Sequence, residues 1–407
     1  MAAKGQGTVP ALVVTVAAAL LAILSWMSAS DRVTATSTQP EKSYFGGAAA
    51  AQTAFLELAA NDPENALVSA RRAVRTAPID PSSTSALGSS LLTLGRADDA
   101  YAAFSVAGSL GWRNVPTQFY WLAQAEAVGD VDVLAQRLDA LLRLDIDNEL
   151  VQSSLHVLAR STLGQQALAM LLTKNPPWGA KFVTGTGALE GADLAGRMAA
   201  IDLAVANGAP IDCNDVGIAA NSLIRKHNAD AARDLWRRAC DRSNNSLIFN
   251  GAFDANPGTA SASPFTWQLQ SQAGLDVAVR PGPKPLSGNA LEIRSSMTVR
   301  TIAARQIMAL RPGTYQLSWM TALDNGRPDT SIKVLVYCSD AGSKSAVEPD
   351  SGAMADNRAA TDFMVPSEGC PIQTVGIQKA ATGLQGTETG WIDNVQIVPI
   401  SETGDAS

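Results

Sequence analysis

The spacing of apolar and polar positions divides the chain into three parts. Residues 11–27 form an uncharged apolar run, and Lys4 precedes it. Residues 46–243 carry turn signals at intervals that suit short helices, such as Asp62-Pro63 and Gly95. From residue 244 to 400, short runs of alternating apolar and polar residues are separated by glycine, proline and asparagine, which is typical of strands.

This pattern predicts a multidomain chain with a transmembrane helix, an all-α array and an all-β sandwich, in that order. A chain of 407 residues is too long for one hydrophobic core, which agrees with several domains. The boundaries that we predict are 1–30 for the membrane segment, 31–45 for a polar linker, 46–243 for the helices, 244–400 for the sandwich and 401–407 for a polar tail.

The apolar run at residues 11–27 is just long enough to span a bilayer. Lys4 and the terminal amine favour an N-terminus on the cytoplasmic side. For a bacterial chain we therefore expect a single pass through the inner membrane, with most of the chain in the periplasm. The alternative is cleavage at Val33-Thr34-Ala35, which would leave the rest of the chain secreted or free in the periplasm.

Residues of the helical part recur with a period of 34. The first copy contains Ala54, Ala66, Ala70 and Ala73, and the next has Gly88, Ala100, Phe104 and Ala107 at the matching positions. Small residues let two antiparallel helices approach closely, and such pairs stack because one pair cannot bury its own apolar face. Over about residues 46–243 the chain resembles the tetratricopeptide-repeat (TPR) family. A generic array of helical hairpins is the alternative.

The resemblance to TPR proteins implies protein binding rather than catalysis. In that family the first helix of each pair lines a concave face that holds the partner. The positions on this chain that would line it are Phe55, Leu58, Ser85, Ser89, Leu92, Tyr120 and Gln124. They are neutral and include no Lys/Arg clamp for a terminal carboxylate, so we expect a protein partner held by shape and apolar contact. The alternative is that these residues pack between helices.

The strand candidates after residue 244 predict an antiparallel sandwich. Four motifs, in order along the chain, make it resemble the jelly-roll modules of carbohydrate-binding proteins: Asn250–Asp254, Phe265–Trp267, Leu310–Tyr315 and Gly390–Val395. The resemblance implies a jelly-roll fold and a possible polysaccharide ligand.

Strand parity separates core positions from exposed ones, because successive side chains face opposite sides of a sheet. Most conspicuous aromatic residues share a face with aliphatic ones and therefore belong to the core: Tyr315 and Trp319 with Leu317, Phe265 and Trp267 with Leu269, and Trp391 with Val395 and Ile397. Tyr337 instead shares a face with Lys333. We predict Tyr337 as the ligand-binding aromatic residue, with Lys333 and Gln316 as its neighbours.

The resembled modules often hold a structural calcium ion between their first and last strands. Asn250, Asp254 and Asp393 could begin such a ligand set, since calcium takes carboxylate and carbonyl oxygens. The alternative is that Asp254 ends a turn and Asp393 bonds to backbone. No other cofactor is expected.

The composition argues against several functions. The chain has 31 Lys and Arg residues against 38 Asp and Glu residues, a net charge of −7, and no basic block that would suit a nucleic acid. Its two histidines lie near neither a serine elbow nor metal-ligand spacing. We predict no enzymatic activity. A hydrolase or lyase acting on glycans is the competing class, because its two carboxylates can be distant in sequence.

The four cysteines support export. Cys213 and Cys240 fall at adjacent ends of two predicted antiparallel helices, and Cys338 and Cys370 fall at the edges of two predicted strands. We predict the disulfides 213–240 and 338–370, with buried free thiols as the alternative. The sequence as a whole indicates an exported scaffold or adaptor in cell-envelope or exopolysaccharide assembly. In a third interpretation the sandwich is only a structural or protein-binding cap.

Overall fold

The computed structural model of the chain describes residues 22, 23, 25, 46–241, 246–254, 263–339, 346, 347, 357–382 and 386–400. Apart from residues 22, 23 and 25, the predicted membrane segment and the linker 31–45 lie outside the described residues, and so does the tail from 401. Within these described ranges no helix is both long and apolar enough to cross a membrane. The chain forms two compact units, Met1–Leu155 and His156–Ser407.

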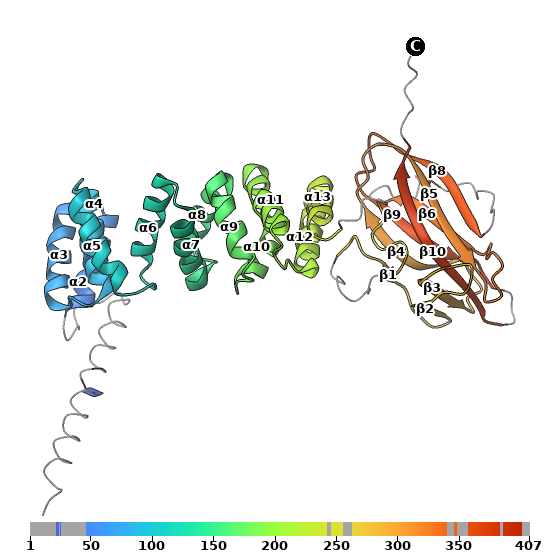
Figure 1. Cartoon of the computed structure of the whole chain (residues 1–407), viewed down its shortest axis with the longest axis horizontal. Helices are drawn as coiled ribbons and strands as arrows, with labels where there is room; N and C mark the ends of the chain where they lie inside the picture. The colour runs from blue at the N-terminus through green and yellow to red at the C-terminus, as the bar shows by residue number, and fades with distance from the viewer. Residues whose placement is uncertain are drawn as a thin grey trace, which may run out of the picture. The chain divides into compact units, whose positions relative to one another are not determined.

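The first unit contains helices whose starting points repeat every 34 residues (Figure 1). They are α2 (Gly47–Ala59), α3 (Pro63–Thr76), α4 (Pro81–Thr93), α5 (Ala97–Ser109), α6 (Val115–Val128) and α7 (Val131–Asp145). Helices α2, α4 and α6 begin at 47, 81 and 115, and α3, α5 and α7 begin at 63, 97 and 131. Each pair packs together, as the period predicts. Membership of the TPR family stays a prediction.

Side-chain caps and small residues explain these helices locally. The side chains of Asp62, Asp80, Asn114 and Asp130 each accept a hydrogen bond from a first-turn backbone N–H, at 3.0 to 3.3 Å. Position 88 requires glycine because Phe104 of the next helix packs against it. A Cβ atom at position 88 would lie 2.8 Å from the Phe104 ring. The first copy has Ala54 and Ala70 at these positions, so a larger residue on one helix is matched by a smaller one on the other.

The second unit begins within α8 (Glu149–Arg160) and continues, in the described residues, through six further helical segments to a sandwich. The helical segments are α9 (Thr162–Leu172), α10 (Gly179–Gly185), the 3₁₀ turn η2 (Thr186–Ala188), α11 (Gly191–Ala206), α12 (Cys213–Arg225) and α13 (Ala229–Ala239). The predicted disulfide Cys213–Cys240 joins the start of α12 to the end of α13, with Cα atoms 5.7 Å apart.

The sandwich consists of two five-stranded sheets whose paired strands are antiparallel. Sheet A has the order β1 (Gln268–Leu269), β4 (Thr301–Met308), β9 (Gln373–Lys379), β6 (Ile332–Cys338), β7 (Ala346–Val347). Sheet B has the order β2 (Leu275–Pro281), β3 (Asn289–Ser295), β10 (Glu388–Pro399), β5 (Gly313–Ala322), β8 (Arg358–Val365). The predicted disulfide Cys338–Cys370 is also present, with a Cα–Cα distance of 5.2 Å.

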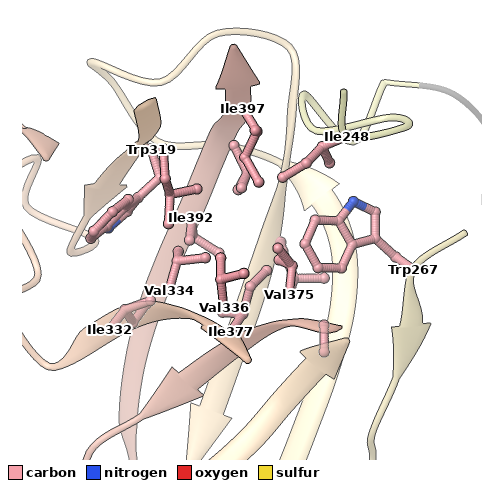
Figure 2. Packing of buried hydrophobic residues seen from close by; sticks show 14 of the residues in the cluster. Ile248, Trp267, Trp319, Ile332, Val334, Val336, Val375, Ile377, Ile392 and Ile397 are labelled. Carbon is pink, nitrogen blue, oxygen red and sulfur yellow. The ribbon is translucent and has the colours of Figure 1, made fainter. Parts of the chain in front are cut away.

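The core lies between the two sheets. Figure 2 shows Ile392 and Ile397 of β10 near Val334 of β6 and Val375 of β9, and these side chains belong to one buried cluster. Tyr315, Trp319 and Trp267 are buried in the same cluster, as parity predicted.

Trp391 departs from the prediction that it shares a face with Val395 and Ile397. The pairing of β10 with β5 shifts register between Asp393 and Gln396, so the strand bulges there and its side-chain alternation is reset. Ile392 therefore points into the core, and Trp391 packs on the opposite face against Leu286, Ala290 and Ala322. The indole nitrogen of Trp391 donates to Asp324 at 2.7 Å.

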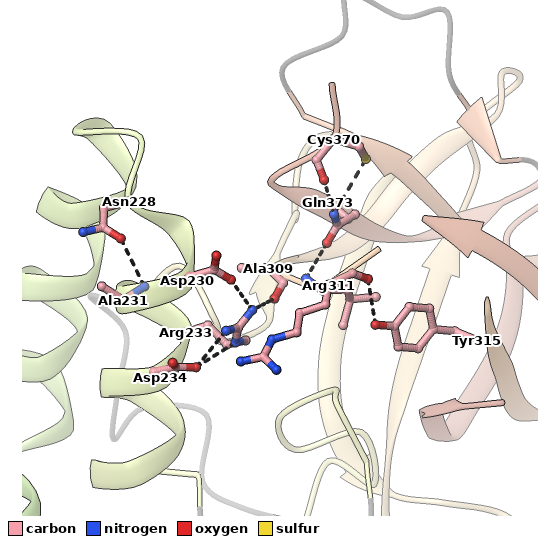
Figure 3. A network of polar contacts seen from close by, with 11 residues as sticks. Asn228, Asp230, Ala231, Arg233, Asp234, Ala309, Arg311, Tyr315, Cys370 and Gln373 are labelled. Atoms are coloured by element: carbon pink, nitrogen blue, oxygen red, sulfur yellow. Dashed lines mark hydrogen bonds and ion pairs between the residues drawn. The ribbon is translucent and has the colours of Figure 1, made fainter. Parts of the chain in front are cut away.

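Helix α13 packs directly on the sandwich. Trp236 is buried and lies against Phe249 and Phe265, with ring centroids 5.4 and 6.1 Å away. Arg233, which is paired with two aspartates of its own helix, donates to the carbonyl oxygen of Ala309 at 2.9 Å (Figure 3). The last helix and the sandwich therefore share a packed interface.

Candidate functional site

The outer face of sheet A carries the predicted ligand-binding tyrosine. Along β6 the core residues Val334 and Val336 alternate with outward residues, and the same alternation holds on β9. On β4 the register shifts between Ile302 and Ala304, so Ala303 and Ala304 both face the core and the alternation resumes at Arg305. The outward side chains that we group as the sheet A face are Gln268, Ile302, Arg305, Ile307, Lys333, Leu335, Tyr337, Thr374 and Gln378, together with Gly376.

Gly376 lies at the centre of this face, on the middle strand β9. A Cβ atom at this position would lie 3.3 Å from the side chain of Ile302 and 3.6 Å from the ring of Tyr337. The two side chains thus approach the glycine from the strands on either side. The Tyr337 ring is only half-buried, and its hydroxyl has no hydrogen-bond partner in the described part of the chain. Both the ring and the hydroxyl are therefore available to a ligand.

Apart from the apolar Ile307 and Leu335, the remaining side chains of the sheet A face are polar or cationic. Arg305 donates through Nε to the side-chain oxygen of Gln268 at 3.0 Å, which orients its guanidinium group. Thr374 shares a hydrogen bond of 2.8 Å with Ser339. Among the described residues this face contains no aspartate or glutamate. An aromatic ring on a face that also carries hydrogen-bonding groups is an arrangement that can recognise a sugar ring.

The structure brings together two of the three predicted ligand-binding residues. Lys333 and Tyr337 lie on the sheet A face, whereas Gln316 lies on β5 in sheet B. Its neighbours Tyr315 and Leu317 point into the core, so Gln316 points away from it, and its amide donates to Asp362 at 3.4 Å. The prediction that Gln316 neighbours Tyr337 is wrong, because strand order cannot be obtained from local pattern. Arg305 and Gln268 were missed for the same reason.

The predicted partner face of the helices is only partly exposed. Ser85 is fully buried and donates to the carbonyl of Ser82, and Tyr120 is stacked on Phe104 with centroids 4.1 Å apart. For these two residues the alternative of packing between helices holds. Phe55 and Leu58 pack against the alanine cluster of α2 to α4 and are partly exposed. Ser89 is half-buried, and Leu92 and Gln124 are exposed.

A groove of about 730 Å³ lies beside Phe55 in the first unit. Its walls come from α2, from the start of α4 and from the segment before α6. Trp112 lines it with half of its surface exposed, and the guanidinium group of Arg137 stacks 4.2 Å from the Trp112 ring. Trp112 occupies the repeat position of Pro78, 34 residues later, but the repeat alone does not predict that it lines a groove, because it lies between α5 and α6.

The predicted calcium ligands Asp254 and Asp393 lie close enough for their charges to interact. Asp393 is fully buried on β10 and accepts a hydrogen bond of 2.6 Å from the backbone N–H of Asn394, and another from that of Ser287. Asp254 accepts one of 2.9 Å from the backbone N–H of Asn289. Asn250 contributes its backbone carbonyl to the indole N–H of Trp267, at 3.1 Å.

Burial raises the pKa of Asp393 to about 6, and the neighbouring carboxylate of Asp254 adds to the effect. The folded protein thus holds this proton more tightly than the unfolded chain, whose reference value is 3.8. The resulting stabilisation is complete below about pH 4 and is lost as the pH rises through about 6.

We expect Asp393→Asn to remove this pH dependence. In the presence of EDTA, the free energy of unfolding of the wild-type chain should fall by about 2 kcal/mol relative to the variant between about pH 4 and pH 7. Urea titrations of both proteins across this range would measure the difference. Parallel pH profiles would show that Asp393 ionises normally in the folded state.

Comparison with known proteins gives only distant similarities. No family model and no curated protein matches the chain. It is similar to the CBM22-1 xylan-binding domain of Paenibacillus barcinonensis Xyn10C, with 12% identity over 36% of this chain and 90% of that domain, at a TM-score of 0.27. It is also similar to a family 16 carbohydrate-binding module, with 19% identity over 37% of this chain and 99% of that module, at a TM-score of 0.25.

A third similar structure is the enzymatically active domain of tailspike protein 4 from bacteriophage CBA120. The identity is 16% over 38% of this chain, and the TM-score is 0.25. The chain spans only 21% of the length of that structure. At these scores the likenesses carry no argument about ligand or activity.

Proposed function

We propose that the protein is a non-enzymatic adaptor, with a sandwich that binds a polysaccharide and helical repeats that hold a protein partner. The observation that carries the proposal is the sheet A face, where the half-exposed Tyr337 ring lies beside Gly376 and polar side chains such as Arg305, Lys333 and Gln378 share the same face. Aromatic faces stack on sugar rings, and neighbouring donors and acceptors fix the sugar's orientation.

Binding accounts for this face better than cleavage does. Ordinary glycoside hydrolysis needs two carboxyl groups on either side of the scissile bond. The described residues of the sheet A face supply neither, and the buried Asp393 lies on β10, in the other sheet. The competing function as a hydrolase or lyase would need a different site.

The protein partner in our proposal docks in the groove beside Phe55 and Trp112. Two partly exposed aromatic rings beside a stacked arginine are the kind of surface that anchors an apolar segment of another protein. We also propose that residues 1–30 hold the chain in the inner membrane, with both units in the periplasm. The uncharged run at 11–27 and the two disulfides support this location.

Calcium remains a proposed structural ion at Asp254 and Asp393. The described residues contain no cluster of three or more His, Cys, Asp or Glu side chains that could hold a metal. An ion here would therefore need carbonyl oxygens in addition to the two carboxylates. It would relieve the repulsion between Asp254 and Asp393, and its role would be to stabilise the sandwich.

A glycan array tests the proposed function. The full-length chain in detergent should bind a defined set of glycans, and Tyr337→Ala should lose that binding while both variants unfold at the same temperature. Calcium should raise the unfolding temperature of the chain. It should have little effect on which glycans bind. An array on which the folded chain binds nothing would contradict the proposal and favour the sandwich as a structural cap, a role that the packing of α13 would also suit.

A further inference from the structure

The sheet A face differs in charge from the chain as a whole. The protein carries a net charge of −7, yet the charged side chains described on this face are Arg305 and Lys333 alone, and both are exposed. A local excess of positive charge on an acidic protein is a feature that attracts anions. The positive charge of the sheet A face therefore favours ligands that carry negative charge.

The strand registers place the two cations on the same face as Tyr337, in the direction of Leu335. Arg305 pairs across the sheet with Gly376, and Gly376 pairs with Leu335. Lys333 and Tyr337 lie two residues before and after Leu335 on β6. Arg305 is thus two strand spacings of about 4.8 Å each from β6, on the opposite side of Gly376. Lys333 is four residues from Tyr337 along β6, about 13 Å, on the far side of Leu335. A polysaccharide that stacks one sugar on the ring and extends across the sheet A face in the direction of Lys333 would pass both positive charges.

The arginine is arranged to receive a carboxylate. Its Nε is held by Gln268 at 3.0 Å, while its two terminal nitrogens have no partner among the described residues. A guanidinium group oriented in this way offers two parallel donors to a planar anion, and such charge-assisted bonds are stronger than neutral ones. Lys333 supplies a second, less directional charge.

We propose that the polysaccharide bound by the sheet A face is anionic and carries carboxylate groups, as a polymer of uronic acids does. This inference rests on the proposed glycan-binding function and narrows it. A neutral sugar would use the Tyr337 ring and the amide groups but would leave both cations without a counter-charge.

Matched pairs of polymers provide the test. Polygalacturonate, alginate and hyaluronan would each be presented beside a carboxyl-reduced form, which has the same backbone without the charge. We expect the full-length chain to bind at least one charged polymer about tenfold or more tightly than its reduced form. Raising the salt concentration should weaken that binding.

Variants locate the charge effect. Arg305→Gln and Lys333→Gln should each lower affinity for the charged polymer about fivefold to tenfold and leave the reduced polymer almost unaffected. Arg358→Gln is the matched control, because Arg358 is an exposed cation on the outer side of sheet B. An equal loss with Arg358→Gln would overturn the inference, because it would indicate attraction by overall charge.

The outcomes separate this inference from the function on which it rests. In one outcome the chain binds charged and reduced polymers equally, Tyr337→Ala loses this binding and Arg305→Gln keeps it. That result would overturn the inference that the ligand is anionic, but it would support glycan binding by the sheet A face. Failure of the folded chain to bind any glycan, charged or neutral, would overturn both.

Discussion

Replacing the buried Lys379 with methionine should lower the free energy of unfolding of the sandwich by about 3–5 kcal/mol. Lys379 is 1% exposed and its amine lies 2.8 Å from Asp329, which is 3% exposed. The amine also donates to Ser331 at 2.5 Å. Without the lysine, the Asp329 carboxylate would stay buried with no compensating cation. Urea denaturation followed by circular dichroism would measure the loss.

Two further variants decide whether the ion pair is the cause. Lys333→Met makes the same change at an exposed lysine and should cost less than about 1 kcal/mol. Lys379→Met combined with Asp329→Asn should recover part of the loss, since the unpaired charge is then removed as well. A cost below about 1 kcal/mol for Lys379→Met alone would show that the pair contributes little.

Gly390 belongs to the same arrangement. A Cβ atom at Gly390 would fall on Asp329 Oδ2 and lie 2.8 Å from the Lys379 amine. The glycine on β10 therefore makes room for an ion pair contributed by the segment before β6 and by β9. This provides a structural reason for glycine in the Gly390-Trp391 motif, independent of any ligand.

Trp236→Ala should lower the free energy of unfolding of the second unit by a similar amount, about 3–5 kcal/mol. The ring is 2% exposed and packs on Phe249 and Phe265 of the sandwich, so its removal leaves a cavity at the interface with α13. Because both sides share the ring, we expect the last helices and the sandwich to lose stability together. Calorimetry combined with near-ultraviolet circular dichroism would follow the two transitions.

Trp112→Ala is the matched control, since Trp112 is half exposed and lies in the first unit. It should change the stability of the second unit hardly at all. If Trp236→Ala destabilised only the helices and left the sandwich transition in place, the interface would not couple them.

Much of the fold could be predicted from periodic patterns. The residues that recur with a period of 34 fall at matching places in α2 and α3 and in α4 and α5, because small residues at helix contacts recur with the helices themselves. Alternation in the sequence predicts strands at 265–269, 276–279, 290–293, 303–310, 313–321, 331–338, 374–378 and 390–398. These overlap eight of the ten strands in the described residues, because alternation follows directly from the pleat. Strand β8 was missed, since its sequence, RAATDFMV, mixes charged and small residues on its outward side.

The candidate site was predicted less well, because it depends on which strands are neighbours. Tyr337 and Lys333 lie on one strand, so parity alone places them together. Arg305 joins them only because β9 pairs with both β4 and β6, and Gln316 is excluded because β5 belongs to the other sheet. The bulge in β10 places Trp391 on the face opposite to the one predicted, and no feature of the local sequence predicts the bulge.

Titration of the glycan identified on the array into full-length wild-type, Tyr337→Phe and Tyr337→Ala proteins tests the central claim most directly. If the ring of Tyr337 stacks on the sugar, phenylalanine should keep most of the affinity and alanine should lose about tenfold or more. Unfolding curves of the three proteins should coincide. Unchanged affinity in Tyr337→Ala would contradict the account, because the sheet A face would then not be the binding surface.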